Sequence, residues 1–160
     1  RKFSDKPIEK EKLDAILEAG RIAPTGHNYQ PYRVYVLQSA EALEKIRGLT
    51  RCAFNAPVVL MVTVRKDEEW VNPFEHSIRA GEQDASIVAT HMMLEAWDLG
   101  IGACWGGFLT AAIRNFEGLR EYLAIGSDEH VCGAQMFGYP LLRPARQYPI
   151  RKPLNISWIK

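Results

Sequence analysis

Apolar residues recur at the spacing of an amphipathic helix in several parts of the chain. Leu13 and Ile16 lie on one such face with charged residues between them, and Pro24 ends the pattern. A second stretch has Ser39 as a candidate N-cap. A third is apolar or small on nearly all sides before Gly100, as in a long buried helix with a glycine C-cap. The pattern predicts helices over residues 7–23, 39–50, 80–99 and 110–123.

Other stretches have the composition of β-strands. Residues 31–38 alternate in polarity and are rich in aromatic and β-branched side chains. Residues 55–64 are apolar on both faces, as in a central strand that is covered on two sides. Residues 130–139 are a further predicted strand, and residues 101–108 a short strand or a turn. The polar, proline-containing stretch 65–77 is a predicted loop or short helical segment.

The order of these elements favours an α+β fold. The predicted strands are not followed by the glycine-rich phosphate turn of a doubly wound nucleotide-binding fold. Neither an internal repeat nor an interdomain linker interrupts the pattern. We therefore expect a single domain over residues 1–160, built as a sandwich of a sheet and helices.

The composition is that of an ordinary globular protein. Of its 160 residues, 47% are hydrophobic and 24% are charged, with a formal net charge of +1. Such a balanced charge gives no global field that would attract nucleic acid or an acidic membrane surface. No apolar run approaches the roughly 20 residues of a membrane span. We expect neither a nucleic-acid partner nor a membrane partner.

The cysteines and histidines do not predict a metal site. Cys52, Cys104 and Cys132 are far apart and odd in number, which fits neither a disulfide framework nor close ligand spacing. A reducing compartment, the cytoplasm, is therefore the expected location. The histidines share no metal-ligand spacing, and no serine lies in a G-x-S-x-G motif. We expect no metal and no side-chain nucleophile.

The sequence GIGACWG at residues 100–106 is similar to a dinucleotide-binding fingerprint, but that function is rejected. Its glycines are one residue too far apart, and the motif follows a helix instead of a strand. Two interpretations stay open. Gly100 can cap the helix while Gly102 permits close backbone packing, or Gly106 and Gly107 can let main-chain N–H groups approach a planar ligand.

The sequence APTGHNYQPYR at residues 23–33 joins the first predicted helix to the first predicted strand. Pro31 fixes its own φ and disfavours helical geometry at the preceding residue, so we expect an extended Gln30 held in a defined direction. Asn28 and Gln30 bring amide groups that can donate and accept hydrogen bonds. The segment is a predicted ligand-binding loop.

The last 20 residues carry a local excess of positive charge. Guanidinium groups there suit the oxygens of a phosphate, because they form paired charge-assisted hydrogen bonds. The alternative is a solvated basic tail, which composition alone favours. The cations are Arg143, Arg146, Arg151, Lys152 and Lys160, and no acidic residue accompanies them.

Taken in chain order, several segments resemble the nitroreductase family of FMN-dependent oxidoreductases. The segments are RKF, APTGHNYQPYR, DLGIGACWGGF, GYP and IRKPL, and the likeness runs through essentially the whole chain. The resemblance implies a nitroreductase-like α+β sandwich, with a central, mostly antiparallel sheet flanked by helices. It also implies ping-pong turnover, in which NAD(P)H reduces FMN and leaves before a small acceptor such as a nitroaromatic, quinone or flavin takes the electrons. The flavin would carry the chemistry, so no catalytic side chain is expected.

The resemblance also assigns cofactor-binding roles to residues of this chain. Arg1 would reach the polar edge of the flavin ring, where a cation favours reduction. Gly106 and Gly107 would lie near the redox-active nitrogen with Trp105 packed behind them, and Arg151 would pair with the phosphate. The loop along the ring and ribityl chain would comprise Pro24, Thr25, Gly26 and Asn28, with Gln30 bracing it.

The resemblance further implies a homodimer with FMN at the interface, each chain completing the other's pocket. The sequence permits this, because the predicted helix 80–99 is apolar over more of its circumference than one small sheet could cover. The alternative is a buried central helix in a monomer.

Departures from the family pattern leave other functions open. The family usually has an Arg and a Ser shortly before the position of Arg1, and some members have a second basic residue where this chain has Pro149. FMN affinity should suffer without them. Residues 65–84 are too short for an inserted lid, so we expect a compact, open site. The alternatives are a flavin-binding module without turnover, or a relative with different chemistry such as reductive dehalogenation.

Overall fold

The computed structural model describes residues 1–141 and 150–159. Its helices and strands follow one another in a mixed order, as the sequence predicts. They are α1 (Lys10–Arg21), the short 3₁₀ helix η1 (Gly26–Asn28), β1 (Tyr32–Leu37), α2 (Ala40–Leu49), the 3₁₀ helix η2 (Arg51–Ala53), β2 (Val58–Arg65), α3 (Gly81–Asp98), β3 (Gly102–Trp105), α4 (Gly107–Arg114), α5 (Glu117–Tyr122) and β4 (Glu129–Gly138).

The strands form one antiparallel sheet in the order β1-β2-β4-β3. The central position of β2 confirms the prediction from its two apolar faces, and its residues from Val58 to Val64 are all buried. The register between β2 and β4 shifts between Val62 and Thr63, where β4 carries an extra residue. The α+β sandwich predicted from the sequence is therefore present.

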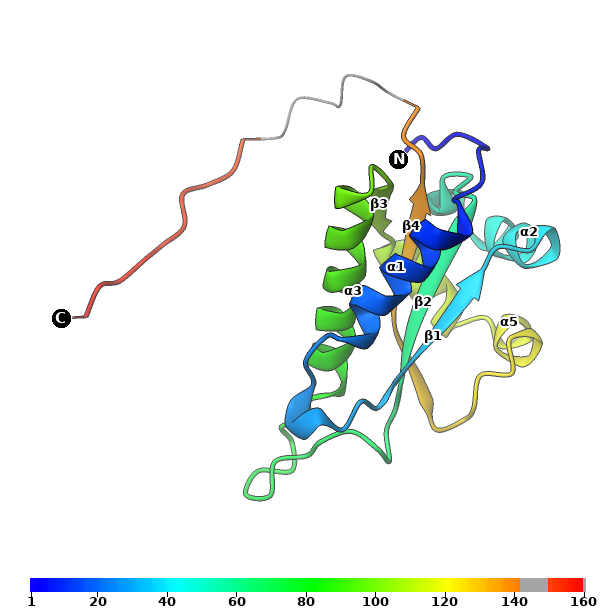
Figure 1. The fold of residues 1–160 in the computed structure, drawn as a ribbon. Helices are drawn as coiled ribbons and strands as arrows, with labels where there is room; N and C mark the ends of the chain where they lie inside the picture. Colours follow the sequence, from blue (N-terminus) through cyan, green and yellow to red (C-terminus); the bar gives the residue numbers. More distant parts are fainter. Residues whose placement is uncertain (142–149, 160) are drawn as a thin grey trace.

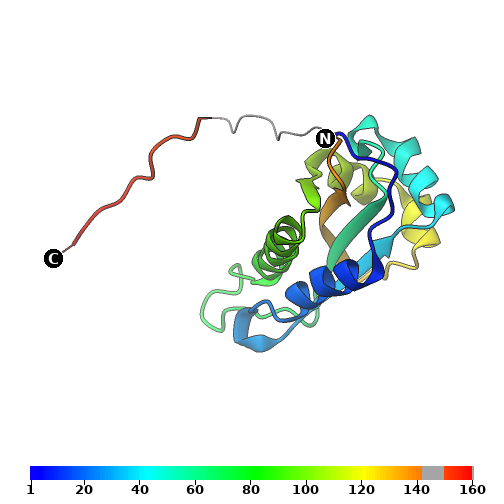
Figure 2. The ribbon, with the colours of Figure 1, turned by 45° about the horizontal axis from the view of Figure 1, so that its top comes forward.

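Helices cover both faces of the sheet (Figure 1, Figure 2). Because successive side chains of a strand point to opposite faces, Leu60 and Val62 of β2 pack in the layer of α1 and α3. Val59 and Met61 pack on the other face with α2, α4 and α5. These two apolar layers hold the helices on the sheet and so determine where the connecting loops lie.

Two predicted helices have different boundaries in the structure. The helix predicted over 110–123 is two helices, because Asn115 caps α4 and Phe116 takes an extended conformation before α5. Helix α4 begins earlier than predicted, at Gly107, and α1 begins at Lys10 instead of residue 7. The sequence predicts a loop or a short helical segment over residues 65–77, and they contain no helix, so the loop is the alternative that is present.

Helix α3 is not buried all round. Its C-terminal glycine cap is confirmed, since Gly100 has a φ of 74° just after the last turn. Val88 and Met92 are buried against the sheet and α1, but one face of the helix is open. Leu94 and Trp97 on that face are 65% and 63% exposed. A fully buried central helix, the alternative considered for a monomer, is therefore wrong.

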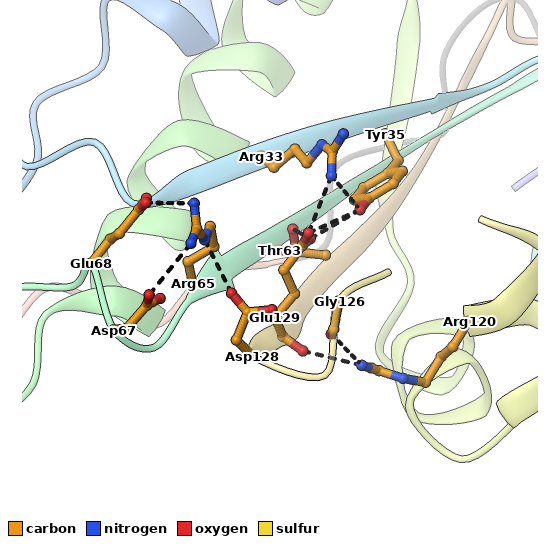
Figure 3. Close-up of polar contacts among 10 residues, drawn as sticks. All are labelled: Arg33, Tyr35, Thr63, Arg65, Asp67, Glu68, Arg120, Gly126, Asp128 and Glu129. Carbon is orange, nitrogen blue, oxygen red and sulfur yellow. Dashed lines mark hydrogen bonds and ion pairs between the residues drawn. The ribbon is translucent and has the colours of Figure 1, made fainter. Parts of the chain in front are cut away.

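A buried carboxylate ties three strands together at one end of the sheet (Figure 3). Glu129 of β4 accepts hydrogen bonds from the hydroxyls of Thr63 at 2.7 Å and Tyr35 at 3.0 Å, and from Arg33 Nη1 at 3.2 Å. Burial alone would raise the pKa of Glu129, but these donors outweigh it and hold the pKa below its ordinary value. The side chain is a structural link between β1, β2 and β4.

Glu129→Gln should lower the free energy of unfolding at neutral pH by about 1–3 kcal/mol, because an amide cannot accept from all of these donors. Since the folded pKa is depressed, the stabilisation is present above the unfolded pKa and is lost as pH falls through the folded value. The variant should therefore show a weaker loss of stability in acid, measured by urea unfolding between about pH 7 and about pH 3.

Glu68→Gln is the matched control for that experiment. Glu68 also pairs with an arginine, Arg65, but both side chains are largely exposed (Figure 3). Its substitution should change the unfolding free energy little. Equal effects of the two substitutions would contradict the role assigned to Glu129.

Candidate functional site

The loop after α1 is held in one shape by its own hydrogen bonds. The backbone N–H of Asn28 donates to the Thr25 carbonyl at 3.0 Å, and that of Gln30 donates to Thr25 Oγ1 at 3.1 Å. The Gln30 side chain donates from Nε2 to the Asn28 carbonyl at 3.2 Å. Gln30 thus braces the loop, while Pro24 and Asn28 are exposed.

The backbone of this loop differs from the expectation for Gln30. Its φ is 52°, in the left-handed region, and His27 and Asn28 also have positive φ values of 50° and 58°. The extended geometry predicted from Pro31 is therefore wrong. The three residues with positive φ turn the chain so that the Gln30 N–H reaches the Thr25 hydroxyl. The two hydrogen bonds made by Gln30 offset part of the backbone strain.

Two contacts anchor the loop to the rest of the fold. The Gly26 N–H donates to Asp84 Oδ1 of α3 at 2.9 Å. The His27 ring stacks on Trp70 of the 66–80 segment, with centroids 5.3 Å apart. The sequence analysis missed Asp84 and Trp70. The only available signal was a carboxylate on an otherwise apolar helix face beside Ala85 and Val88.

The glycines after α3 have different environments. A Cβ on Gly102 would lie 3.2 Å from the Gly138 carbonyl, so the predicted close backbone packing is present. A Cβ on Gly106 would lie 3.0 Å from the Ala134 carbonyl, which accepts the Gly106 N–H at 2.8 Å. A Cβ on Gly107 would meet nothing within 4 Å. Among the described glycines at residues 100–107, Gly107 is the one whose missing side chain neither packing nor a positive φ explains.

Trp105 lies at the end of β3 beside these glycines. Its ring covers Gly133, where a Cβ would come within 2.8 Å of the indole. The side chain is nonetheless 40% exposed, so it packs against the sheet and also forms part of the surface.

Arg1 is positioned by the first residues of the chain, which pair with the end of β4. Phe3 forms a β-bridge with Pro140 and is buried, and Ser4 N donates to the Tyr139 carbonyl at 2.8 Å. The Arg1 guanidinium lies over the ring of Phe54, 5.7 Å from its centroid. Arg1 itself is exposed and lies at the end of the sheet where β4 ends (Figure 1).

The structure does not bring Arg1 and the 24–30 loop together within one chain. In both overall views they lie at opposite ends of α1 (Figure 1, Figure 2). Helix α1 has 12 residues and so spans about 18 Å. The two parts are therefore separated by about the length of this helix.

Arg151 lies in the segment 150–159, which has no helix or strand and whose side chains are exposed. Among the described residues Arg151 makes no ion pair. Lys152 lies next to it and is exposed as well. The other cations of the basic tail, Arg143, Arg146 and Lys160, and the departure at Pro149 lie outside the described residues.

Other chemistry has little support in the part of the chain that the structure describes. Residues 1–141 and 150–159 contain no group of three or more His, Cys, Asp or Glu side chains that could hold a metal ion. Burial raises the pKa of the Cys132 thiol to about 12, so this cysteine is a poor nucleophile. No helix among these residues is long and apolar enough to span a bilayer.

Comparisons with known sequences converge on one family. The profile described as "Nitroreductase family" matches residues 1–55 and 49–139. A Methanothermobacter thermautotrophicus protein, provisionally named NADH dehydrogenase/NAD(P)H nitroreductase, is 31% identical over 149 residues, which cover 90% of this chain and 73% of that protein. The FMN reductase (NAD(P)H) of Bacillus subtilis is 26% identical, with 92% of this chain and 64% of that protein covered.

Solved structures share the fold. A nitroreductase family protein from Clostridium difficile 630 matches with a TM-score of 0.80 and 33% identity, covering 90% of this chain and 80% of that chain. A provisionally assigned nitroreductase from Desulfovibrio desulfuricans, crystallised in complex with FMN, matches with a TM-score of 0.78 and 26% identity, covering 96% and 86%.

Proposed function

Because the chain belongs to the nitroreductase family, we propose that it is an FMN-dependent oxidoreductase that passes electrons from NAD(P)H to a small acceptor by a ping-pong mechanism. The acceptor class would be a nitroaromatic, a quinone or a similar molecule. The FMN reductase name of one relative and the FMN complex of another support the cofactor. A cytoplasmic location and a single domain over residues 1–160 are part of the same proposal.

The observation that carries the proposal is the open main chain at Gly107. Apart from the chain neighbours and the backbone of α4 itself, no atom of the described residues lies within 4 Å of the position that a side chain would take there, although the adjacent Gly106 is tightly packed. A planar group can therefore approach the backbone at the start of α4. This arrangement fits a flavin ring lying against the N–H groups of that turn.

Different residues of the chain would bind different parts of the cofactor. FMN, once bound, would supply the hydride and electron transfer. Arg1 would place a positive charge at the pyrimidine edge, and Arg151 would pair with the phosphate. Thr25 and Asn28 would orient the ring and ribityl chain from the braced loop. None of these side chains has to act as a nucleophile.

We further propose that the complete site needs two copies of the chain. Arg1 and the Gly26–Asn28 turn lie toward opposite ends of α1, and in this proposal the turn of one copy would face Arg1 and Gly107 of the other. The exposed apolar face of α3, with Ile87, Leu94 and Trp97, offers a surface for such an isologous contact. The open site expected from the short 65–84 stretch stays a prediction.

The adjacent glycines provide a direct test of the open main chain. Gly106→Ala should destabilise the fold by about 1–3 kcal/mol, because its methyl group would press on the Ala134 carbonyl. Gly107→Ala should change the unfolding free energy by less than about 0.5 kcal/mol. It should nevertheless weaken FMN binding by about 1–3 kcal/mol, because the methyl group takes space that the ring needs. Urea unfolding and flavin fluorescence quenching measure the two effects.

Unchanged FMN affinity in a well-folded Gly107→Ala protein would remove this backbone position from the site. The cofactor itself is tested by purifying the protein, recording its visible absorption, and identifying the chromophore released by denaturation. FMN in near-stoichiometric amount is the expected result. Protein that is colourless and takes up no added FMN would refute the proposed function.

A further inference from the structure

Asp84 is a carboxylate in an unusual place. It lies in the first turn of α3 and is only 2% exposed, although aspartate is rarely buried without partners. Its Oδ1 accepts the Gly26 N–H at 2.9 Å. Its Oδ2 is also buried and has no hydrogen-bond partner among the described residues. A buried carboxylate with a single partner costs stability, so packing alone does not explain it.

The backbone at Gly26 is closely packed against neighbouring side chains. A Cβ on Gly26 would lie 3.0 Å from the Ala80 Cβ and 3.3 Å from the Trp70 Cβ. The glycine backbone is therefore seated directly against the residues that begin α3. The Asn28 N–H and the Tyr29 N–H in turn bond to Thr25 and Gly26. The bond between Gly26 and Asp84 is thus one of the two contacts that anchor the turn, beside the stacking of His27 on Trp70.

We propose that Asp84 is a positioning residue for the flavin-binding loop, holding the Gly26 N–H so that Thr25 and Asn28 face the ligand. This inference rests on the proposed function for its ligand, but the contact between Asp84 and the loop does not. The residue does not touch the cofactor itself. It acts through the 24–30 loop.

The charge of Asp84 sets the strength of this bond. An N–H donated to an ionised carboxylate makes a stronger bond than one donated to a neutral carboxyl group. Burial raises the pKa of Asp84, and the nearby Glu69 adds to the rise. Protonation therefore begins at a higher pH than for an ordinary aspartate, and the loop should loosen as the solution becomes acidic.

Other charged groups lie around the contact and have to be separated from Asp84. Glu69 is itself held by Arg79 and by the Gly81 N–H, and His27 belongs to the loop. Farther along, Glu82 pairs with His130 and Arg114. Because several charged groups surround the contact, only a substitution at Asp84 isolates its contribution.

The test compares Asp84→Asn and Asp84→Ala with the wild-type protein. Asparagine keeps an oxygen for the Gly26 N–H and does not titrate, whereas alanine removes the acceptor. Asp84→Ala should raise the dissociation constant for FMN at least about tenfold at neutral pH. Asp84→Asn should stay within about threefold of wild type at neutral pH. The ratio of the asparagine variant's constant to the wild-type constant should fall as the pH is lowered, since only the wild-type bond weakens on protonation. Taking this ratio cancels the titration of the FMN phosphate.

A second measurement needs no flavin. Amide hydrogen exchange of the 23–31 segment in the FMN-free protein should accelerate in Asp84→Ala and stay near wild type in Asp84→Asn, with the 58–65 segment unchanged as a check of folding. Asp98→Asn, an exposed aspartate at the other end of α3, is the matched control and should change neither readout.

The outcomes separate the two proposals. Faster exchange in Asp84→Ala with unchanged FMN affinity would overturn the positioning role. Unchanged exchange in the alanine variant would show that Asp84 does not hold the loop in place. Failure of the wild-type protein to bind FMN would instead refute the proposed function, and the exchange experiment would still decide whether Asp84 holds the loop.

Discussion

Arg151→Ala should weaken FMN binding by about 10- to 100-fold and leave riboflavin binding unchanged. A charge-assisted bond from the guanidinium to the phosphate contributes about 1.5–3 kcal/mol, and about 1.4 kcal/mol corresponds to a factor of ten. Riboflavin has no phosphate, so it cannot use that contact. Titration of the FMN-free protein with each flavin, followed by fluorescence, measures both constants.

Lys152→Ala is the matched control, because it removes a neighbouring exposed cation from the same segment. It should change FMN affinity much less, because it removes positive charge near the site but no direct bond to the phosphate. Equal effects of the two substitutions would reduce Arg151 to one charge among several. An equal loss of riboflavin binding would show that Arg151 does not act on the phosphate.

Mixing two inactive variants should restore flavin binding. If each site combines Arg1 of one copy with the 24–30 loop of the other, an Arg1→Glu chain and an Asn28→Ala chain have complementary defects. Each homodimer would have two damaged sites, whereas a mixed dimer would have one intact site and one doubly damaged site. Random pairing after refolding a one-to-one mixture should therefore recover roughly one quarter of the wild-type sites.

This experiment also tests the oligomeric state. The recovered sites should bind FMN with the wild-type dissociation constant, because one site in each mixed dimer contains no substitution. A mixture that binds no more FMN than the separate variants would contradict a site shared between chains. Sedimentation of the FMN-bound wild type as a monomer would contradict it as well.

Much of the fold could be predicted because local patterns and packing agree. The two apolar faces of β2 required cover on both sides, and the sheet provides it by placing β2 between β1 and β4. The prediction was wrong where a local capping choice decided the structure. Asn115 and Phe116 interrupt the stretch 110–123, and no change in hydrophobic period marks that break.

The candidate site was less predictable because its geometry depends on contacts between distant residues. The bracing role of Gln30 is present, yet its left-handed backbone opposes the usual effect of Pro31 and results from bonds to Thr25 and Asn28. The contact of Asp84 with Gly26 spans 58 positions of the chain. No local pattern encodes such a pair. The opposite placement of Arg1 and the loop emerges only once α1 is laid across the sheet.

The most direct test of the central claim is an anaerobic titration of the purified, FMN-loaded protein with NADH and, separately, NADPH, followed by visible absorption. An FMN-dependent oxidoreductase should lose its oxidised-flavin absorption with about one equivalent of at least one donor, and should regain it when a quinone or nitroaromatic is added. Flavin that stays oxidised with both donors in excess would contradict the account and leave a flavin-binding module without turnover.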